Sequence, residues 1–306
     1  MGMRVRVGTA SWTDPTLVKD SDFYPRKSMS AEERLRHYAS IFPMVEVDAT
    51  YYFPPTRDLA GLWVGRTPPD FRMDVKSYSL FTQHPTQTKS LWPDVAEDLG
   101  EDKREQRNVY LADLPHPAVD RAWEHFADAL LPLQSAGKLG AVFFQFPPWF
   151  GPRHSSRDYL RQLRRRLPEY PLAVEFRNNR WLRDADDRRK TFELLESEGL
   201  AYVCVDEPQG FPSSVPPELA VTADLAVLRF HGHNDENWDK KGISAAERFR
   251  YLYSEQELAR WKPRVGQLSD SARETHLVFN NCYRDYGVNN ARQLAAILGE
   301  GVVEDA

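Results

Sequence analysis

The sequence is poor in cysteine, has no long apolar run and carries no excess of basic residues. Only two cysteines, Cys204 and Cys282, occur among 306 residues, too few for a disulfide framework or a thiolate metal cage. No stretch approaches the roughly 18 consecutive apolar residues of a membrane-spanning helix. These absences predict a cytoplasmic protein that does not cross a membrane.

The charge balance argues against a protein that binds nucleic acid over its whole surface. The formal net charge is −5, and the basic run Arg161, Arg164, Arg165 and Arg166 lies on one expected outer helix. Such a run is usually a solvated face, so nucleic acid as a partner is only weakly supported. Glycine-rich phosphate loops of the Walker or dinucleotide type are also missing, and no organic cofactor is expected.

Eight short runs of β-branched and aromatic residues, most of them followed by a stretch with helical periodicity, are the main positive signal. Strands that alternate with helices predict βαβ units, and eight such units predict an α/β fold with a closed (β/α)8 barrel of the TIM type. One barrel needs about 250 residues, so we expect a single domain over residues 1–306. The runs cover residues 5–7, 45–47, 71–75, 141–146, 172–176, 201–205, 225–230 and 277–279.

The outer helices can be placed from the periodicity between these runs. Ser30 followed by Glu33 is the pattern of a capping box at a helix N-terminus. Two connections differ from the rest: the four prolines of residues 208–217 predict an irregular loop, and the charge-rich segment 77–117 predicts an insertion over the barrel mouth or a flap. The expected helices cover residues 30–42, 56–66, 118–135, 156–167, 187–198, 255–267 and 290–298.

Polar side chains gather where the runs end, and in a TIM barrel the carboxyl ends of the strands form the active face. Carboxylates brought together there can divide acid and base roles if their surroundings separate their pKa values. A histidine at a strand end is the natural proton carrier because its ordinary pKa lies near neutrality. The expected catalytic residues are Glu46, Lys76, Glu175, Asp206 and His231.

The cationic groups at the strand ends favour an anionic substrate. Arginine forks suit planar carboxylates and phosphates, and lysine acts as a compact charge. Aromatic and amide side chains nearby can stack on a sugar or a base and supply directional hydrogen bonds. The expected substrate-binding residues are Trp12, Asp48, Tyr51, His84, Gln145, Arg177, Arg229, Asn280 and Asn281.

Ordered motifs at these strand ends resemble those of one family. They are Gly8-Thr9-Ala10-Ser11-Trp12, residues 45–52, Gln145-Phe146-Pro147-Pro148, Glu175-Phe176-Arg177, Arg229 with His231-Gly232, and Asn280-Asn281. Through them nearly the whole chain resembles the YecE-like family, a domain of unknown function. The resemblance implies a TIM barrel and brings no settled activity. Two positions depart from the family pattern: Ser11 stands where glycine is usual, and Asp48 where asparagine is usual.

The sequence leaves three functions open. The first is an enzyme of the hydrolase, isomerase or lyase type that performs acid/base chemistry on an anionic, phosphorylated or nucleotide-like substrate. The second is a metal-assisted phosphoesterase similar to sugar-isomerase and abasic-site endonuclease barrels, in which Glu46, Glu175, Asp206 and His231 would bind a divalent metal. The third is a non-catalytic binding or adaptor module. Nothing in the sequence sets the oligomeric state.

Overall fold

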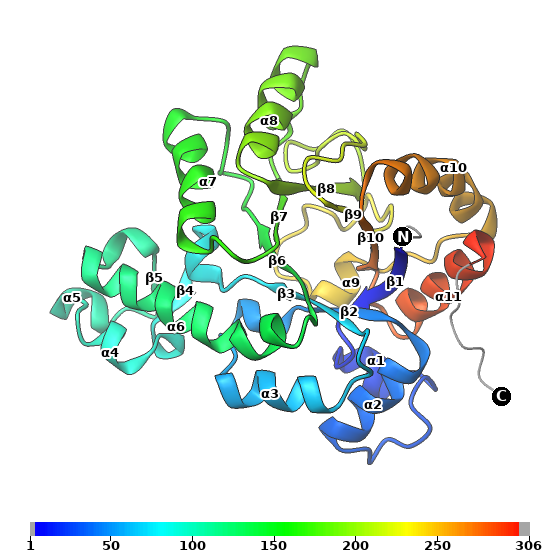
Figure 1. Ribbon diagram of the computed structural model, residues 1–306, viewed down its shortest axis with the longest axis horizontal. Coiled ribbons are helices and arrows are strands. Elements are labelled where there is room, and N and C mark those ends of the chain that lie inside the picture. The colour runs from blue at the N-terminus through cyan, green and yellow to red at the C-terminus, as the bar shows by residue number, and fades with distance from the viewer. Residues whose placement is uncertain (1–3, 300–306) are drawn as a thin grey trace.

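The computed structural model describes residues 4–299 and contains a closed barrel of parallel strands (Figure 1). This confirms the predicted (β/α)8 barrel. Residues 1–3 and 300–306 of the expected domain lie outside the described residues. In the order in which they pair, with β2 closing the ring against β1, the strands are β1 (Arg4–Ala10), β10 (Glu274–Phe279), β9 (Leu225–Phe230), β8 (Leu200–Asp206), β7 (Leu172–Glu175), β6 (Leu139–Gln145), β3 (Arg72–Lys76) and β2 (Met44–Val47).

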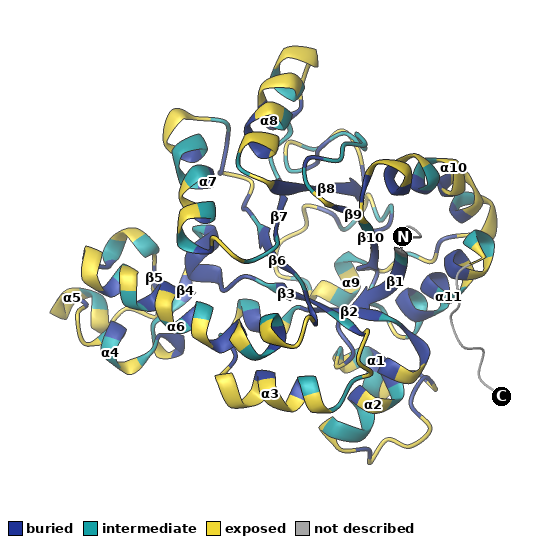
Figure 2. Cartoon of the chain, in the orientation of Figure 1, coloured by how far each residue is buried: buried dark blue, intermediate teal, exposed yellow. Residues whose placement is uncertain are grey.

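Helices surround the barrel, with their exposed faces outward and the strands buried within (Figure 2). The capping box is confirmed, because the Ser30 side chain accepts from the Glu33 N–H while the Glu33 side chain accepts from the Ser30 N–H. None of the helices between residues 4 and 299 is long and apolar enough to span a membrane. The longer helices, all within a few residues of prediction, are α2 (Ala31–Ile41), α3 (Arg57–Gly65), α6 (His116–Ser135), α7 (His154–Arg166), α8 (Ala185–Ser197), α10 (Glu255–Ser271) and α11 (Tyr286–Leu298).

The connection between β8 and β9 is irregular, as its prolines predict. Residues 207–224, all of them described, form neither helix nor strand. Proline lacks the N–H that an interior helical turn needs, so several prolines in one short connection prevent a packed helix there. Two short helices elsewhere, α1 (Pro15–Asp20) and α9 (Ala245–Arg248), were not predicted, because segments of one or two turns show too little periodicity.

The segment 77–117 packs beside α6 and lies at the left of Figure 1. Phe81 stacks on Trp123 of α6 with 3.8 Å between ring centroids, and Trp92 stacks on His125 of the same helix at 5.4 Å. These aromatic contacts anchor the segment to the outside of the barrel. Its elements are the 3-10 turns Ser79–Thr82, Thr88–Ser90 and Leu111–Asp113, strands β4 (Thr86–Gln87) and β5 (Asn108–Val109), and helices α4 (Pro93–Ala96) and α5 (Glu101–Arg104).

Inside the barrel, two charged layers lie on either side of a thin apolar one. Ala10, Met44 and Val278 form a small buried cluster of their own between the layers. On the side of the strands' amino ends lies the base cluster, which consists of Arg6, Asp74, Glu274 and His276. On the side of their carboxyl ends lies the mouth cluster, which consists of Glu46, Glu175, Arg177, Glu207, Arg229 and His231.

Candidate functional site

The centre of the mouth cluster is a guanidinium group held by two carboxylates. Arg229 donates from Nε and Nη2 to the two oxygens of Glu46, both at 2.8 Å, and from Nη1 to Glu175 Oε2 at 2.9 Å. All three side chains are at most 1% exposed. Although burial opposes it, the two carboxylates raise the pKa of Arg229. The bidentate fork that the sequence assigned to a substrate anion is therefore taken by Glu46.

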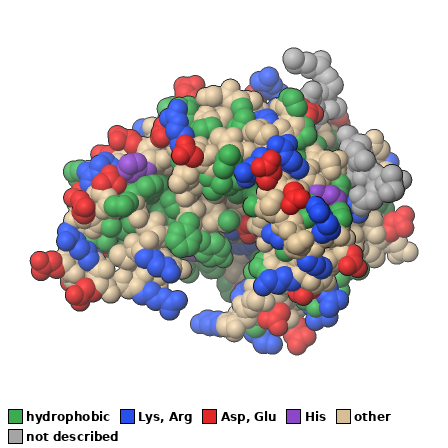
Figure 3. Space-filling view, turned by 90° about the horizontal axis from the view of Figure 1, so that it is seen from below, with side chains coloured by type: hydrophobic (Ala, Val, Ile, Leu, Met, Phe, Trp, Pro, Cys, Tyr) green, Lys and Arg blue, Asp and Glu red, His purple; other side chains and the backbone are tan. Residues whose placement is uncertain are grey.

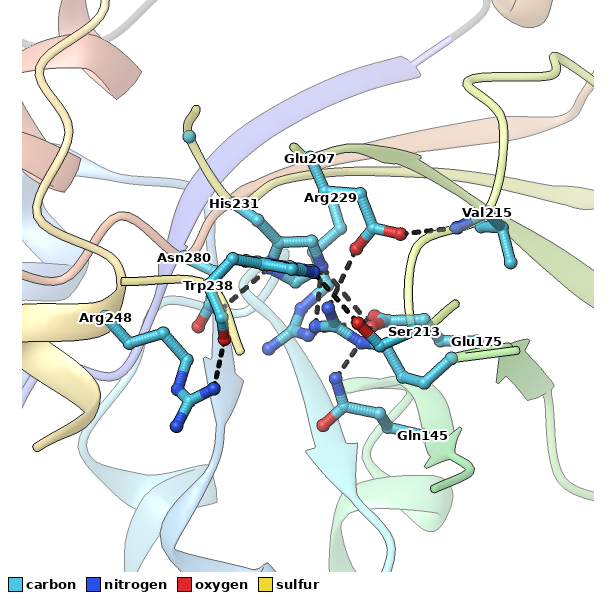
Figure 4. Close-up of polar contacts among 12 residues, drawn as sticks. Gln145, Glu175, Glu207, Ser213, Val215, Arg229, His231, Trp238, Arg248 and Asn280 are labelled. Carbon is cyan, nitrogen blue, oxygen red and sulfur yellow. Dashed lines mark hydrogen bonds and ion pairs between the residues drawn. The ribbon is translucent and has the colours of Figure 1, made fainter. Parts of the chain in front are cut away.

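Arg177 forms the second centre of the cluster. It contacts Glu175 Oε1 from Nε at 2.7 Å and donates from Nη1 to Glu207 Oε2 at 2.8 Å. Gln145 also donates to Glu175 Oε1, at 2.7 Å, and Figure 4 shows Gln145 pointing toward the centre of the cluster. Burial opposes ionisation of Glu175, but Arg177 and Arg229 hold its pKa well below the usual range. The Glu175 carboxylate thus links the two guanidinium groups.

Glu207 is a member of the cluster that the sequence analysis missed. It is fully buried, and its Oε1 accepts from the Val215 N–H at 2.8 Å. Burial raises the pKa of Glu207 to about 8, against the opposing charge of Arg177. Two neighbouring carboxyl groups, Glu175 and Glu207, therefore have pKa values displaced in opposite directions.

Asp206, which was expected in this set, lies on the other face of β8. Its Oδ2 accepts from the Tyr253 hydroxyl at 2.8 Å and from His233 at 3.1 Å. Successive strand residues point to opposite faces, and Val205 pairs in register with the inward Arg229. That alternation places residue 207, rather than 206, in the barrel interior, and it was the signal available in the sequence.

The ring of His231 is held at both nitrogens. Nε2 lies 3.0 Å from Arg177 Nη2 and 3.3 Å from Glu175 Oε1, and Nδ1 lies 2.9 Å from Asn280 Nδ2. The Asn280 amide nitrogen donates to Nδ1, and Nε2 lies between the Arg177 guanidinium and the Glu175 carboxylate. Burial and the charge of Arg177 lower the pKa of His231 to about 3. His231 is a neutral ring held by its neighbours on both sides, and not the free proton carrier expected from sequence.

A cavity of about 460 Å³ borders the cluster through Gln145 and Arg177. The Arg177 guanidinium lies over the Trp238 ring, 5.0 Å from its centroid. Figure 3 shows a hollowed face of the molecule with hydrophobic side chains along the hollow and charged side chains around it. The cavity is lined by Tyr51, His84, Gln145, Phe146, Pro147, Pro148, Arg177, Ser213, Trp238, Asp239, Arg248 and Phe249.

Lys76 is a cation of the mouth that keeps its donors available. It is partly exposed at the end of β3, with Nζ 5.1 Å from the centroid of the Tyr51 ring. Within residues 4–299, no acceptor forms a hydrogen bond with this ammonium group. Desolvation, together with Arg229, lowers the pKa of Lys76, while Glu46 and Asp48 oppose that shift.

His84 presents a fixed tautomer beside Lys76. Its Nδ1 lies 2.9 Å from the Thr82 hydroxyl, which itself donates to the Ser79 carbonyl at 3.2 Å. The hydroxyl proton is therefore used, so His84 Nδ1 carries the ring proton and Nε2 keeps its lone pair. No residue in the range 4–299 bonds to Nε2. Burial and the charge of Lys76 lower the pKa of His84 to about 4.

The two positions that depart from the family pattern interact with each other. Ser11 has a φ of 101°, a backbone conformation that favours glycine. Its hydroxyl donates to the Asp48 carboxylate and accepts from the Thr13 N–H at 3.0 Å. Burial raises the pKa of Asp48, and Lys76 opposes the shift. This chain thus has a serine and an acid in contact where the pattern has glycine and asparagine.

Five of the nine expected binding residues do not line the cavity: Trp12, Asp48, Arg229, Asn280 and Asn281. Asn281 is fully buried and donates to Tyr251 O and Asn290 Oδ1, both at 2.9 Å, so it ties a loop to α11. Trp12 is buried and packs edge-on against Trp63, with 6.1 Å between centroids. Tyr51, His84, Gln145 and Arg177 do line the cavity.

The basic run on α7 is largely engaged within the fold. Arg161 binds Asp158 at 2.8 Å, and Arg166 pairs with Asp120. Arg164 donates to backbone carbonyls, including that of Gly199 at 2.7 Å. These arginines stabilise the outer layer of the barrel.

The expected metal ligands do not gather around one point. Within residues 4–299, no group of three His, Cys, Asp or Glu side chains is arranged to hold a metal ion. Glu46 and Glu175 instead direct their oxygens to Arg229, and Asp206 faces Tyr253. The side-chain geometry therefore gives no support to the metal-assisted alternative.

The profile of a family described as "Protein of unknown function DUF72" matches residues 6–305. The chain belongs to this family. It is similar to UPF0759 protein YunF of Bacillus subtilis, with 31% identity over 299 residues that cover 96% of this chain and 94% of the relative. A crystal structure of a DUF72 family protein from Thermotoga maritima is 31% identical, with a TM-score of 0.75 and coverage of 97% and 100%. Another from Enterococcus faecalis is 26% identical, with a TM-score of 0.74 and coverage of 98% and 99%.

Proposed function

We propose that this DUF72 protein is an enzyme that performs acid/base chemistry on a small anionic substrate in the mouth cavity. One observation carries the proposal: Lys76 and His84 both contact the Tyr51 ring, at 5.1 and 5.2 Å from its centroid, and both have groups with no hydrogen-bond partner within residues 4–299. The pair combines an available positive charge with an available lone pair.

The two groups have separate roles in this proposal. Lys76 binds the anion and stabilises negative charge that develops during the reaction, which is the larger contribution in many enzymes. His84 Nε2 accepts a proton from the substrate. The pKa of His84 is about 4, and an anion bound next to the ring raises it toward neutrality, because an opposite charge favours the protonated form.

In this proposal the other charged groups of the mouth shape the cavity and add one more contact for the anion. Arg177 and Arg229 are neutralised by Glu46 and Glu175, and Arg177 also donates to Glu207, so the two arginines order the cavity floor. On the opposite wall, Arg248 uses Nη1 and Nη2 to bind the carbonyls of Trp238 and Lys240. Its Nε makes no hydrogen bond within residues 4–299 and adds a second cationic contact for an anion.

Proton exchange tests the proposal across a panel of candidate substrates. Sugar phosphates and nucleotides are incubated with the protein in D2O, and proton NMR follows loss of carbon-bound hydrogen signals and formation of products. We expect exchange or conversion of at least one compound, and a reduction of about 10²–10⁴-fold in His84→Asn, the range for loss of a general base. The matched control is His154→Asn, because His154 is exposed on α7 and, among residues 4–299, pairs only with Asp158.

The outcomes separate the enzyme from a binding module. Wild-type protein that binds phosphate compounds but neither exchanges nor converts any of them contradicts the catalytic proposal and favours a non-catalytic module. Equal rates in His84→Asn and wild type remove His84 from the mechanism. Thermal melts of both variants close to wild type make the rates comparable.

A further inference from the structure

A second cavity, of about 590 Å³, lies beside the mouth cavity and is bordered by α6, α7 and the segment 77–117. The two cavities share a wall. Gln83 and Trp149 line the second cavity, whereas their chain neighbours His84 and Pro148 line the mouth. The rings of His84 and Trp149 are in contact, with 5.7 Å between centroids. The rings of His84 and Trp149 therefore form part of the wall between the two cavities.

The lining of the second cavity is aromatic and aliphatic. Trp149 is 57% exposed and Tyr110 is 46% exposed, although large aromatic side chains are usually well buried. Leu111, Leu114 and Val119 add apolar surface, and His116 and Arg166, which pairs with Asp120, also line the cavity. A volume of this size falls within the roughly 300–1,000 Å³ typical of small-molecule sites.

Two side-chain amides supply free hydrogen-bonding groups in this mainly apolar cavity. The side chains of Gln83 and Gln162 both line it, and neither forms a hydrogen bond within residues 4–299. Gln83 is held at a φ of 60°, a strained backbone conformation for a residue other than glycine. Such strain is concentrated at ligand sites, where the surrounding structure maintains it.

These features select a class of ligand. A sugar ring would bring several hydroxyl groups into a mainly apolar space, and each one left without a partner costs about 1–3 kcal/mol. A planar heteroaromatic ring has apolar faces for Trp149 and Tyr110 and a few polar edge atoms that match two amides. The cavity therefore fits a flat ring with hydrogen-bonding edges better than a carbohydrate.

We infer that the second cavity binds a planar heteroaromatic ring of the nucleobase kind, attached to the anionic group that occupies the mouth. The inference rests on the proposed function for the anionic end, and it names a nucleotide-like compound as the substrate class. The ring stacks near Trp149, and the linking atoms pass the edge of the His84 ring.

Three probes separate the two cavities: adenosine 5′-monophosphate, ribose 5-phosphate and adenosine. We expect calorimetry to show that wild type binds the nucleotide at least tenfold more tightly than ribose 5-phosphate.

Val119→Trp, which fills the second cavity from α6, removes that difference and leaves affinity for ribose 5-phosphate unchanged. Trp149→Ala weakens only the two adenine compounds, by about tenfold, since stacking on an aromatic side chain contributes about 1–3 kcal/mol per base. The control Leu59→Trp adds an equal ring on the exposed face of α3.

Each outcome bears on one proposal. Equal affinity of wild type for the nucleotide and ribose 5-phosphate overturns the inference and leaves the proposed function standing. Unchanged nucleotide binding in Val119→Trp also overturns it. If adenosine binds and the phosphate adds nothing to its affinity, the inference holds and the proposed anionic recognition at the mouth fails. If a disaccharide such as maltose competes for the site while adenosine does not, the inferred ligand class is overturned.

Discussion

A lysine lies at each end of the barrel, and the two ammonium groups differ in their hydrogen bonds. At the base, just before β6, Lys138 Nζ donates to Val64 O and Thr67 O, both at 2.7 Å, and to Thr67 Oγ1 at 3.0 Å. At the mouth, Lys76 makes no hydrogen bond to any residue in the range 4–299. The donors of Lys138 are satisfied within the fold, whereas Lys76 at the mouth retains donors that a ligand can satisfy.

A fully buried histidine also lies at each end, and the pKa values of these two histidines are shifted in opposite directions. His276 at the base lies 3.0 Å from Asp74, and despite burial Asp74 and Glu274 raise its pKa to about 9. His231 at the mouth contacts Arg177, and burial together with this charge lowers its pKa to about 3. Burial alone would lower both values, so the neighbouring charges decide the difference.

The largest expected effect is the loss of the guanidinium at the centre of the mouth cluster. Arg229→Met leaves Glu46 and Glu175 buried without their partner, so the free energy of unfolding should fall by about 3–5 kcal/mol. Arg6→Met at the base should cost less, because its partner Glu274 is 24% exposed and can be hydrated. Denaturant unfolding measures both.

A milder variant keeps this prediction testable if Arg229→Met does not fold. Arg229→Lys retains the charge but loses the bidentate contact with Glu46, which should cost about 1.5–3 kcal/mol. Stability of Arg229→Lys equal to wild type would contradict the role assigned to the fork.

The histidine pair predicts opposite pH dependences. His276 has a pKa raised from 6.5 to about 9, so its stabilisation is complete below pH 6.5 and is lost as the pH rises through 9; at ~1.4 kcal/mol per unit this is about 3 kcal/mol. His231 has a pKa lowered from 6.5 to about 3, so its stabilisation is complete above pH 6.5 and is lost as the pH falls toward 3.

Melting temperatures from pH 4 to about 9.5 test these signs. Relative to wild type, His276→Gln should remove part of the alkaline decline and His231→Gln part of the acid decline. Parallel curves for wild type and both variants would show that these pKa shifts are absent.

The lysine pair predicts a difference in stability. Lys138→Met removes a charged donor from three acceptors, and the free energy of unfolding should fall by about 1.5–3 kcal/mol. Lys76→Met should cost no more than about 1 kcal/mol, because a lowered lysine pKa means that the folded state disfavours the charged form. A larger loss of unfolding free energy in Lys76→Met than in Lys138→Met would contradict the view that Lys138 is structural and Lys76 is kept for a ligand.

The smallest expected effect concerns backbone strain, which is found at the mouth. Within residues 4–299, the non-glycine residues with positive φ are Ser11, Gln83 and Arg284, and all follow barrel strands on the mouth side. Ser11→Gly should stabilise the protein by about 1 kcal/mol through relief of that strain. A lower melting temperature would show that the Ser11 hydrogen bonds outweigh the strain.

The fold was predictable because its signals are local. β-branched runs locate the strands, Ser30 with Glu33 marks the start of α2, and the prolines of residues 208–217 exclude a helix. Short elements such as α9 were missed because a single turn has no periodicity. The position of segment 77–117 depends on aromatic contacts with α6, which no local pattern reveals.

The site was predictable only in part, because strand ends give the location of a residue and not its partners. Glu46, Glu175 and Arg229 were expected at the mouth from their strand ends, but the same residues suit a substrate fork or an internal ion pair, and in the structure they pair with one another. Glu207 was missed although strand alternation indicates it. Trp238 lines the cavity from an irregular loop and Arg248 from the short helix α9, and the sequence does not specify the path of this connection.

The central claim is that the mouth, and not the base, recognises an anionic ligand. Calorimetric titration of ribose 5-phosphate into wild type, Lys76→Met and Lys138→Met tests it most directly. We predict binding to wild type, a loss of at least about tenfold in Lys76→Met, equivalent to one charged hydrogen bond, and wild-type affinity in folded Lys138→Met. Equal affinities in wild type and Lys76→Met, or no binding by wild type at all, would contradict it.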